Sequence, residues 1–117
     1  MSKKIIVAGA CRTAIGKMGG SLSNTPSPVL AAIVVKEAMK RAGVAPDKVD
    51  EVVLGCVYQA GLGQNVARQA SLGAGIPVST PAFTINNLCG SGLKSVNIAA
   101  DLIRAGEADV VVAGGVE

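Results

Sequence analysis

Short, uninterrupted apolar runs alternate with longer helical patterns along the chain. The runs cover residues 5–8, 52–54, 83–85 and 110–113, and most of their residues are β-branched. Such runs are typical of strands buried on both faces, as in parallel sheets. The pattern therefore predicts an α/β fold with β-α-β-α-β-α-β order, a mainly parallel sheet and right-handed crossovers.

Three helices are predicted between the runs. In the first, Ser27 is a favourable N-cap, Pro28 suits the first helical position and Gly43 suits the end. The second is expected from near Asn65 to Gly73 or Gly75, and the third from about Gly92 to Ala105, with Gly106 as its C-cap.

The third predicted helix has an unusually wide apolar surface. Its polar residues recur at steps of three and four and so share one narrow face; they are Lys94, Asn97, Asp101 and Arg104. A helix that is apolar over most of its girth is buried on more than one side. Four strands and three helices provide too little cover, so residues 1–117 are expected to form an incomplete domain. The alternative is a small complete domain with a frayed end.

Composition narrows the class of protein. The sequence is 50% hydrophobic and 16% charged, with a mean hydropathy of +0.48, so part of its surface is expected to be covered. The net charge of +3 is small and dispersed, which argues against nucleic acid as a partner. No apolar stretch approaches the roughly 20 residues of a membrane span. The first run starts almost at once and leaves no room for a signal peptide, so a cytoplasmic protein is expected.

Cys89 lies between a predicted strand and the start of the third helix, in the segment INNLCGSGL (85–93). The N–H groups and dipole of a helix N-terminus favour a thiolate and can also receive an oxyanion. Gly90 and Gly92 remove side chains where a substrate would approach the sulfur. From these residues alone, a nucleophile on a sharp strand-to-helix turn and a buried structural cysteine are equally supported.

The other two cysteines, Cys11 and Cys56, lack this context. Each closes an apolar run without a nearby base or helix start, so both are interpreted as structural. An odd number of cysteines without a secretion signal favours reduced thiols. With no C-x-x-C spacing and no histidine, no metal site is expected.

A glycine-rich stretch at 59–66 follows one run and opens a helix, as a dinucleotide-binding loop does. The third glycine of that fingerprint would fall at Val66, so a nucleotide site has only weak support. Gln64, Asn65 and Arg68 are more simply explained as a polar helix entrance.

Acyl transfer by a cysteine needs a base, and forming a carbon–carbon bond needs a second one. The chain has no histidine. The carboxylates are expected at the opposite edge of the sheet from Cys89, on the far side of a helix, or at the chain end; they are Asp47, Asp50, Glu51, Glu107, Asp109 and Glu117. The sequence therefore predicts a nucleophile without its catalytic partners.

Four segments together resemble the start of the thiolases, in the family's order and over the whole chain. They are RTAIGK (12–17), QAGLGQN with ARQ (59–65 and 67–69), NNLCGSGLKS (86–95) and ADVVVAGG (108–115). The C-G-S-G form around Cys89 is similar to the biosynthetic, acetoacetyl-CoA branch, whereas degradative thiolases usually carry serine after the cysteine. Val116 stands where the family has methionine, a conservative apolar difference.

The resemblance implies the N-terminal part of a thiolase and an acetyl-CoA C-acetyltransferase reaction. Cys89 would accept an acetyl group from acetyl-CoA, and its backbone N–H would form part of an oxyanion hole. A second acetyl-CoA, deprotonated at its methyl carbon, would then give acetoacetyl-CoA and CoA. The family's histidine bases, second catalytic cysteine and most of its CoA-binding surface lie in the later part of a longer chain. The family needs no cofactor besides its CoA thioester substrates.

Family members consist of two similar α/β halves and assemble as dimers or tetramers through the amino-terminal half, so a homo-oligomer is implied. Three hypotheses follow for this chain. The first is a thiolase fragment that is inactive alone, the second is one subunit of a split thiolase, and the third is a non-catalytic interaction domain with a thiolase-like fold. Acyl chain length is not fixed by these residues.

Overall fold

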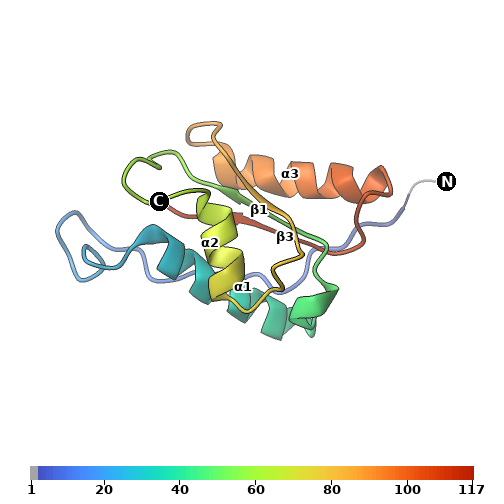
Figure 1. Cartoon of the computed structure of the whole chain (residues 1–117). Coiled ribbons are helices and arrows are strands. Elements are labelled where there is room, and N and C mark those ends of the chain that lie inside the picture. The colour runs from blue at the N-terminus through green and yellow to red at the C-terminus, as the bar shows by residue number, and fades with distance from the viewer. Residues whose placement is uncertain (1–2) are drawn as a thin grey trace.

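Three parallel strands form the centre of the structure, a computed structural model that describes residues 3–117 (Figure 1). They are β1 (Glu51–Gly55), β2 (Ala82–Ile85) and β3 (Val111–Gly115). The strand order is β2-β1-β3, and both neighbours of β1 run parallel to it. The predicted α/β class and the parallel sheet are confirmed.

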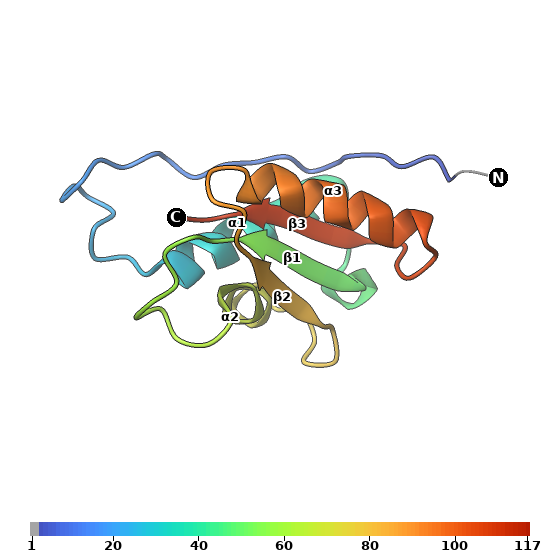
Figure 2. The same cartoon turned by 90° about the horizontal axis from the view of Figure 1, so that it is seen from above.

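Helices cover both faces of the sheet (Figures 1 and 2). α1 (Ser27–Ala42) and α2 (Val66–Gly73) lie on one face, and α3 (Ser91–Arg104) lies on the other. Because β2 and β3 lie on opposite sides of β1, their two crossover helices must use opposite faces to keep the same hand. A short 3₁₀-helix, η1 (Pro46–Lys48), precedes β1.

The core centres on β1. Val52 and Leu54 pack with α1 and α2, and they are 0% and 2% exposed. Val53 is also 0% exposed and points to the opposite face, toward α3, because strand side chains alternate. A strand buried on both faces explains why this run reads as continuously apolar.

The helix ends follow the sequence signals closely, with two corrections. The C-cap of α3 is Ala105 (φ −72°) rather than the predicted Gly106, because the helix ends at Arg104. The N-cap of α1 is Pro26 rather than Ser27: Pro26 has extended backbone (φ −59°, ψ 143°), and its carbonyl oxygen accepts hydrogen bonds from the N–H groups of Val29 and Leu30. No side-chain bond from Ser27 caps the helix. Gly43 ends α1 in the left-handed conformation (φ 67°), as predicted.

Asn65 is the N-cap of α2, and its side-chain oxygen accepts a hydrogen bond from the N–H of Arg68 at 3.1 Å. The helix ends at Gly73. Both predicted ends of α2 are therefore confirmed.

The first predicted strand, at residues 5–8, does not form. This segment has no regular secondary structure, and Ile6 and Val7 are 76% and 82% exposed. It runs extended beside β3 and α3 without joining the sheet (Figure 2). A strand forms only where backbone hydrogen bonds join a segment to a neighbouring edge, and here the segment stays apart from the open edge of β3, across a cavity. The order within the described residues is therefore α1-η1-β1-α2-β2-α3-β3.

A cavity of about 560 Å³ separates this amino-terminal segment from β3. Its lining is mainly apolar and comes from residues 5–11, from α1 and α3, and from the edge of β3. The segment contacts the rest of the structure at a few points. Cys11 Sγ lies 3.3 Å from the Val34 carbonyl oxygen, and a Cβ on Gly9 (φ 72°) would overlap the carbonyl oxygen of Ala38.

Candidate active site

Cys89 lies on a tight turn between β2 and α3, at the edge where the parallel strands end. β2 ends at Ile85 and α3 begins at Ser91, so five residues make the whole connection. Cys89 is exposed, unlike Cys56, which is buried, and Cys11, which is half-buried. The predicted placement of Cys89 between a strand and a helix start is confirmed, and the interpretation as a buried structural cysteine is wrong.

Backbone hydrogen bonds close the turn around this cysteine. The N–H of Gly90 donates to the carbonyl oxygen of Asn87 at 3.1 Å, and the N–H of Ser91 donates to that of Leu88 at 3.0 Å. These two N–H groups are therefore committed to the turn. Leu88 has a positive φ of 50°, which is uncommon for leucine.

Glycines let the start of α3 approach the sheet closely. A Cβ on Gly55, the last residue of β1, would lie 2.6 Å from both the carbonyl carbon and the Cβ of Ser91. A Cβ on Gly115, at the end of β3, would lie 3.4 Å from the Cα of Gly92. The turn therefore sits directly above the carboxyl ends of β1 and β3, where the strand order reverses. Open α/β sheets commonly bind ligands at this point.

Cys56 lies at the same edge but in different surroundings. It is 1% exposed, and its Sγ lies 3.6 Å from Oε1 of Glu117. Burial, reinforced by the charge of Glu117, raises the pKa of the Cys56 thiol to about 11. A thiol held neutral in this way is a poor nucleophile, which supports the structural role predicted for Cys56.

Glu117 holds the loop after β1. Its Oε1 accepts hydrogen bonds from the N–H groups of Val57 and Tyr58, at 3.3 and 3.1 Å. No local pattern in the sequence pairs residues that are 60 positions apart. Their positions just after two adjacent parallel strands, β1 and β3, are the signal that could have revealed this contact.

The loop from 57 to 65 ends in the polar helix entrance that the sequence predicted. Asn65 also accepts a hydrogen bond from Thr84 Oγ1 at 2.8 Å, and Arg68 donates to the carbonyl oxygens of Val78 and Thr80 at 3.0 Å each. These side chains connect loops of the same chain. Val66 is 0% exposed and packs in the core, so the stretch does not support a dinucleotide site.

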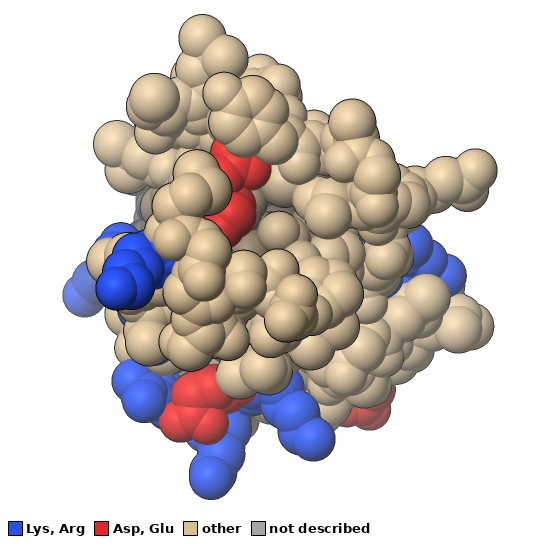
Figure 3. Space-filling view, turned by 90° about the vertical axis from the view of Figure 1, so that its left-hand side faces the viewer, with Lys and Arg blue, Asp and Glu red and all other residues tan. Residues whose placement is uncertain are grey.

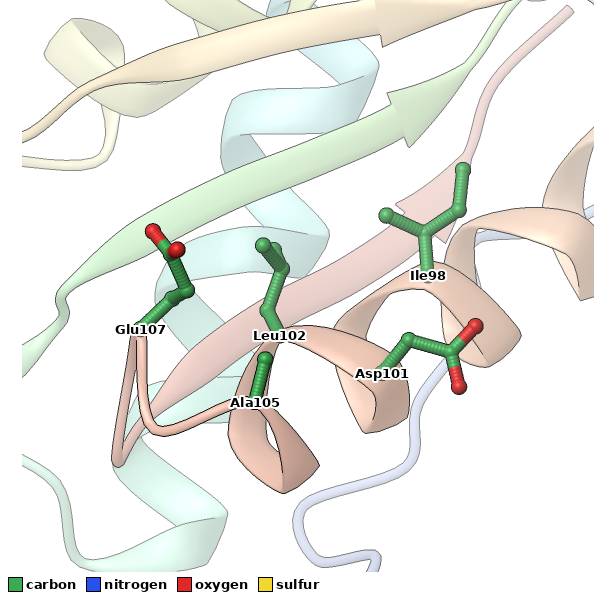
Figure 4. A pocket seen from close by; sticks show the side chains of 5 residues that line it. All are labelled: Ile98, Asp101, Leu102, Ala105 and Glu107. Atoms are coloured by element: carbon green, nitrogen blue, oxygen red, sulfur yellow. The ribbon is translucent and has the colours of Figure 1, made fainter.

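Most of the carboxylates lie away from Cys89, as expected. Asp101 and Glu107 line a shallow hollow beside the far half of α3 (Figure 4), and Asp101 pairs with Arg104 at 3.1 Å. Glu51 begins β1 at the opposite edge, where burial and then the charge of Glu107 raise its pKa. Within residues 3–117 no group of three or more His, Cys, Asp or Glu residues is arranged to hold a metal ion.

The end of the molecule where the strands terminate is mostly uncharged (Figure 3). Lys and Arg side chains lie at the left, lower and right margins of this view, and acidic side chains lie above its centre and at its lower margin. Two large apolar side chains from the loops at this edge are well exposed, Tyr58 at 81% and Leu88 at 69%. None of the helices in the described part of the chain has the length and apolarity needed to cross a membrane.

Comparison with known proteins gives consistent matches across the chain. Residues 5–117 match the family model described as the N-terminal domain of thiolase. The chain is 55% identical over its full length to an acetyl-CoA acetyltransferase of Syntrophomonas wolfei. It is also 56% identical, over 97% of its length, to one of Cupriavidus necator. A cytosolic acetyl-CoA acetyltransferase of Rattus norvegicus is 51% identical over 99% of the chain.

The fold agrees with these matches. The crystal structure of the Bacillus anthracis acetyl-CoA acetyltransferase superposes with a TM-score of 0.88 and 44% identity, over 93% of this chain and 28% of that one. The chain spans only 29–30% of the length of the relatives named above.

Proposed function

Because the chain belongs to the thiolase family through its N-terminal domain, we propose that it is the part of an acetyl-CoA acetyltransferase that carries the acyl-accepting cysteine, Cys89. The observation that carries this proposal is the exposed thiol on the turn between β2 and α3. Of the three cysteines, Cys89 alone combines exposure with a position at a helix N-terminus, where the dipole favours a negative charge.

The proposed reaction begins with attack of the Cys89 sulfur on the thioester carbonyl of acetyl-CoA. A bond forms from the sulfur to the acetyl carbon, the bond from that carbon to the CoA sulfur breaks, and the thiol proton of Cys89 leaves with CoA through a base. A second acetyl-CoA, deprotonated at its methyl carbon, then attacks the acetyl group. Acetoacetyl-CoA forms and the Cys89 thiolate is regenerated. Both half-reactions use CoA thioesters as substrates and need no further cofactor.

The backbone N–H of Cys89 is proposed to contribute to the oxyanion hole of the first step. Donors aimed at a developing oxyanion lower the barrier because they need little reorganisation during the reaction. The neighbouring N–H groups of Gly90 and Ser91 already donate within the turn. A further donor is therefore expected from outside this chain or from the first turn of α3.

The bases of the reaction are proposed to come from sequence that this chain does not contain. The chain has no histidine, and its relatives are more than three times as long. The complete enzyme is proposed to be a cytoplasmic homodimer or homotetramer. By itself, the chain is expected to be acetylated at Cys89 slowly or not at all, and to show no turnover.

The test uses the purified chain and its Cys89→Ser variant. CoA-dependent loss of acetoacetyl-CoA is measured for each, alone and mixed with a polypeptide supplying the remaining two thirds of the S. wolfei relative. We expect no turnover from the chain alone, and turnover in the mixture only when Cys89 is present. Turnover by the chain alone would show that a group within it acts as the base.

Two other outcomes separate the alternatives. If this chain and a naturally separate second polypeptide co-purify as an active enzyme, it is a subunit of a split thiolase. If the mixture is inactive and Cys89 reacts with iodoacetamide no faster than an unfolded cysteine, the chain is a non-catalytic relative and the proposal is wrong.

A further inference from the structure

The side chain of Ser91 lies inside the turn that carries Cys89. Ser91 is the first residue of α3 and is only 4% exposed. Its hydroxyl accepts a hydrogen bond from the N–H of Asn87 at 2.7 Å and donates one to the carbonyl oxygen of Leu88 at 2.6 Å. One buried hydroxyl therefore connects the backbone that precedes Cys89 to the helix that follows it.

The conformation that these bonds hold is an unfavourable one. Leu88 has a φ of +50°, in the left-handed region that leucine rarely adopts, and its side chain is 69% exposed. Packing therefore contributes little to keeping it there. A residue in such a conformation persists only when the surrounding structure imposes it. Asn86 supplies a further constraint, because its Oδ1 accepts a hydrogen bond from the N–H of Leu88 at 3.0 Å.

The position of Ser91 itself is fixed by the sheet. Its backbone and Cβ pack on Gly55, where a Cβ would come within 2.6 Å of them. One turn further along α3, Ser95 is 0% exposed, and its hydroxyl oxygen lies 2.5 and 2.8 Å from the carbonyl oxygens of Gly92 and Gly114, between which its single proton is shared. Both serines face the sheet, but only the hydroxyl of Ser91 reaches the turn.

From these contacts we propose that Ser91 is a positioning residue for Cys89. Its hydroxyl holds Leu88 in the left-handed conformation and thereby keeps the Cys89 sulfur at the positive end of the α3 dipole. This inference rests on the proposed function in taking Cys89 as the acyl acceptor. Ser91 takes no covalent part and transfers no proton in the reaction.

Amide hydrogen exchange of the full 117-residue chain, read residue by residue by NMR, tests the hydrogen bonds directly. In Ser91→Ala we expect exchange at the Asn87 amide to accelerate about tenfold or more, the order expected for losing a buried hydrogen bond of this kind. In Asn86→Ala the acceleration should instead centre on the Leu88 amide. Unchanged exchange at Asn87 in Ser91→Ala would overturn the proposal.

Ser95→Ala is the matched control, since it removes a buried serine hydroxyl from the same face of the same helix. It should lower the stability of the chain without accelerating exchange at Asn87 beyond the change at the amides of α3. If Ser95→Ala accelerates exchange at Asn87 as much as Ser91→Ala does, the effect is general loosening of α3 and the positioning role is refuted.

The second measurement is the alkylation rate of Cys89 by iodoacetamide at fixed pH, as the ratio of native to urea-unfolded chain. We expect Ser91→Ala to bring this ratio about two- to fivefold closer to one, the range of an exposed helix-dipole interaction, and Ser95→Ala to leave it unchanged. No change in Ser91→Ala would overturn the proposal. Neither readout requires acetyl transfer, so a reconstituted mixture that shows no turnover would count against the proposed function while the role of Ser91 is still decided.

Discussion

Two apolar runs of similar composition have different outcomes in this fold. The run 52–54 becomes the central strand β1 and is at most 2% exposed. The run 5–8 stays outside the sheet, with Ile6 at 76% exposed. β1 hydrogen-bonds to β2 on one side and β3 on the other, whereas the amino-terminal segment faces β3 across a cavity of about 560 Å³. Apolar β-branched sequence therefore marks a candidate strand, and hydrogen bonding to a neighbouring strand decides whether it forms.

The largest expected effect comes from truncating Leu54 in β1. The same kind of truncation at Ile6, in the amino-terminal run, is the comparison. Leu54→Ala removes a side chain that is 2% exposed, so we expect it to lower the free energy of unfolding by about 2–5 kcal/mol. Ile6→Ala removes a side chain that is mostly exposed, and should change it by about 0.5 kcal/mol or less. Urea denaturation followed by far-UV circular dichroism measures both. Similar losses for the two variants would show that the amino-terminal segment is packed into the sheet in solution.

The next prediction concerns the close approach of α3 to β1. Gly55→Ala places a Cβ 2.6 Å from backbone and side-chain atoms of Ser91, so the helix start must shift. We expect a loss of about 1–3 kcal/mol, typical of overpacking. Gly92→Ala is the matched control: a Cβ there meets no atom within 4 Å, and alanine favours a helix by up to about 1 kcal/mol. A Gly55→Ala variant as stable as the native chain would contradict this packing.

Much of this fold could be predicted from the sequence because local signals and packing agree. Gly43 and Asn65 end or begin helices through their own backbone and side-chain chemistry. The narrow polar face of α3 is exposed as predicted, at Lys94, Asn97, Asp101 and Arg104. The first strand could not be predicted correctly, because its formation depends on a partner edge that the run itself does not encode.

In the candidate site, too, features set by neighbouring residues could be predicted and long-range contacts could not. The position of Cys89 between a strand and a helix follows from residues close to it in sequence. The contact of Glu117 with Val57 and Tyr58, and the packing of Ser91 on Gly55, join residues far apart along the chain. Long-range contacts of this kind depend on strand order, which apolar runs alone do not determine.

A smaller effect is expected at the cysteines that follow the two runs, in the pH dependence of the free energy of unfolding. Cys56 is 1% exposed and its pKa is raised to about 11, so its buried neutral form stabilises the native state fully below pH 9. This stabilisation is lost as the pH rises from 9 to 11, because the unfolded thiol ionises first. We expect the free energy of unfolding to fall over this window in the native chain and to fall less in Cys56→Ala. Urea titrations at pH 8, 9.5 and 10.5 measure the difference.

Cys11→Ala is the control for that experiment. Cys11 is half-buried in the amino-terminal segment, where its thiol lies against the Val34 carbonyl oxygen. The expected result is a flatter pH dependence between pH 9 and 11 in Cys56→Ala than in this variant. If Cys11→Ala rather than Cys56→Ala flattens the curve, the assignment of the ionising group to Cys56 is wrong.

The smallest expected effect compares the polar contacts that hold each region to the start of β3. Asp50, just before β1, accepts hydrogen bonds on Oδ2 from the N–H groups of Asp109 and Val110, at 2.8 and 3.0 Å, and these bonds lower its pKa below the ordinary 3.8. In the amino-terminal segment, Lys3 only pairs with the exposed Asp109 carboxylate at 3.7 Å. A depressed pKa contributes stability that is present above pH 3.8 and lost as the pH falls through the lower folded value.

We therefore expect Asp50→Asn to be less stable than the native chain at pH 7 and to lose less stability between pH 4 and pH 2. Lys3→Ala should be indistinguishable from the native chain, since an exposed ion pair contributes little. Urea midpoints at pH 7, 4, 3 and 2 decide between them. A larger loss of stability in Lys3→Ala than in Asp50→Asn would mean that the Lys3 ion pair contributes more than the hydrogen bonds of Asp50, and would contradict this prediction.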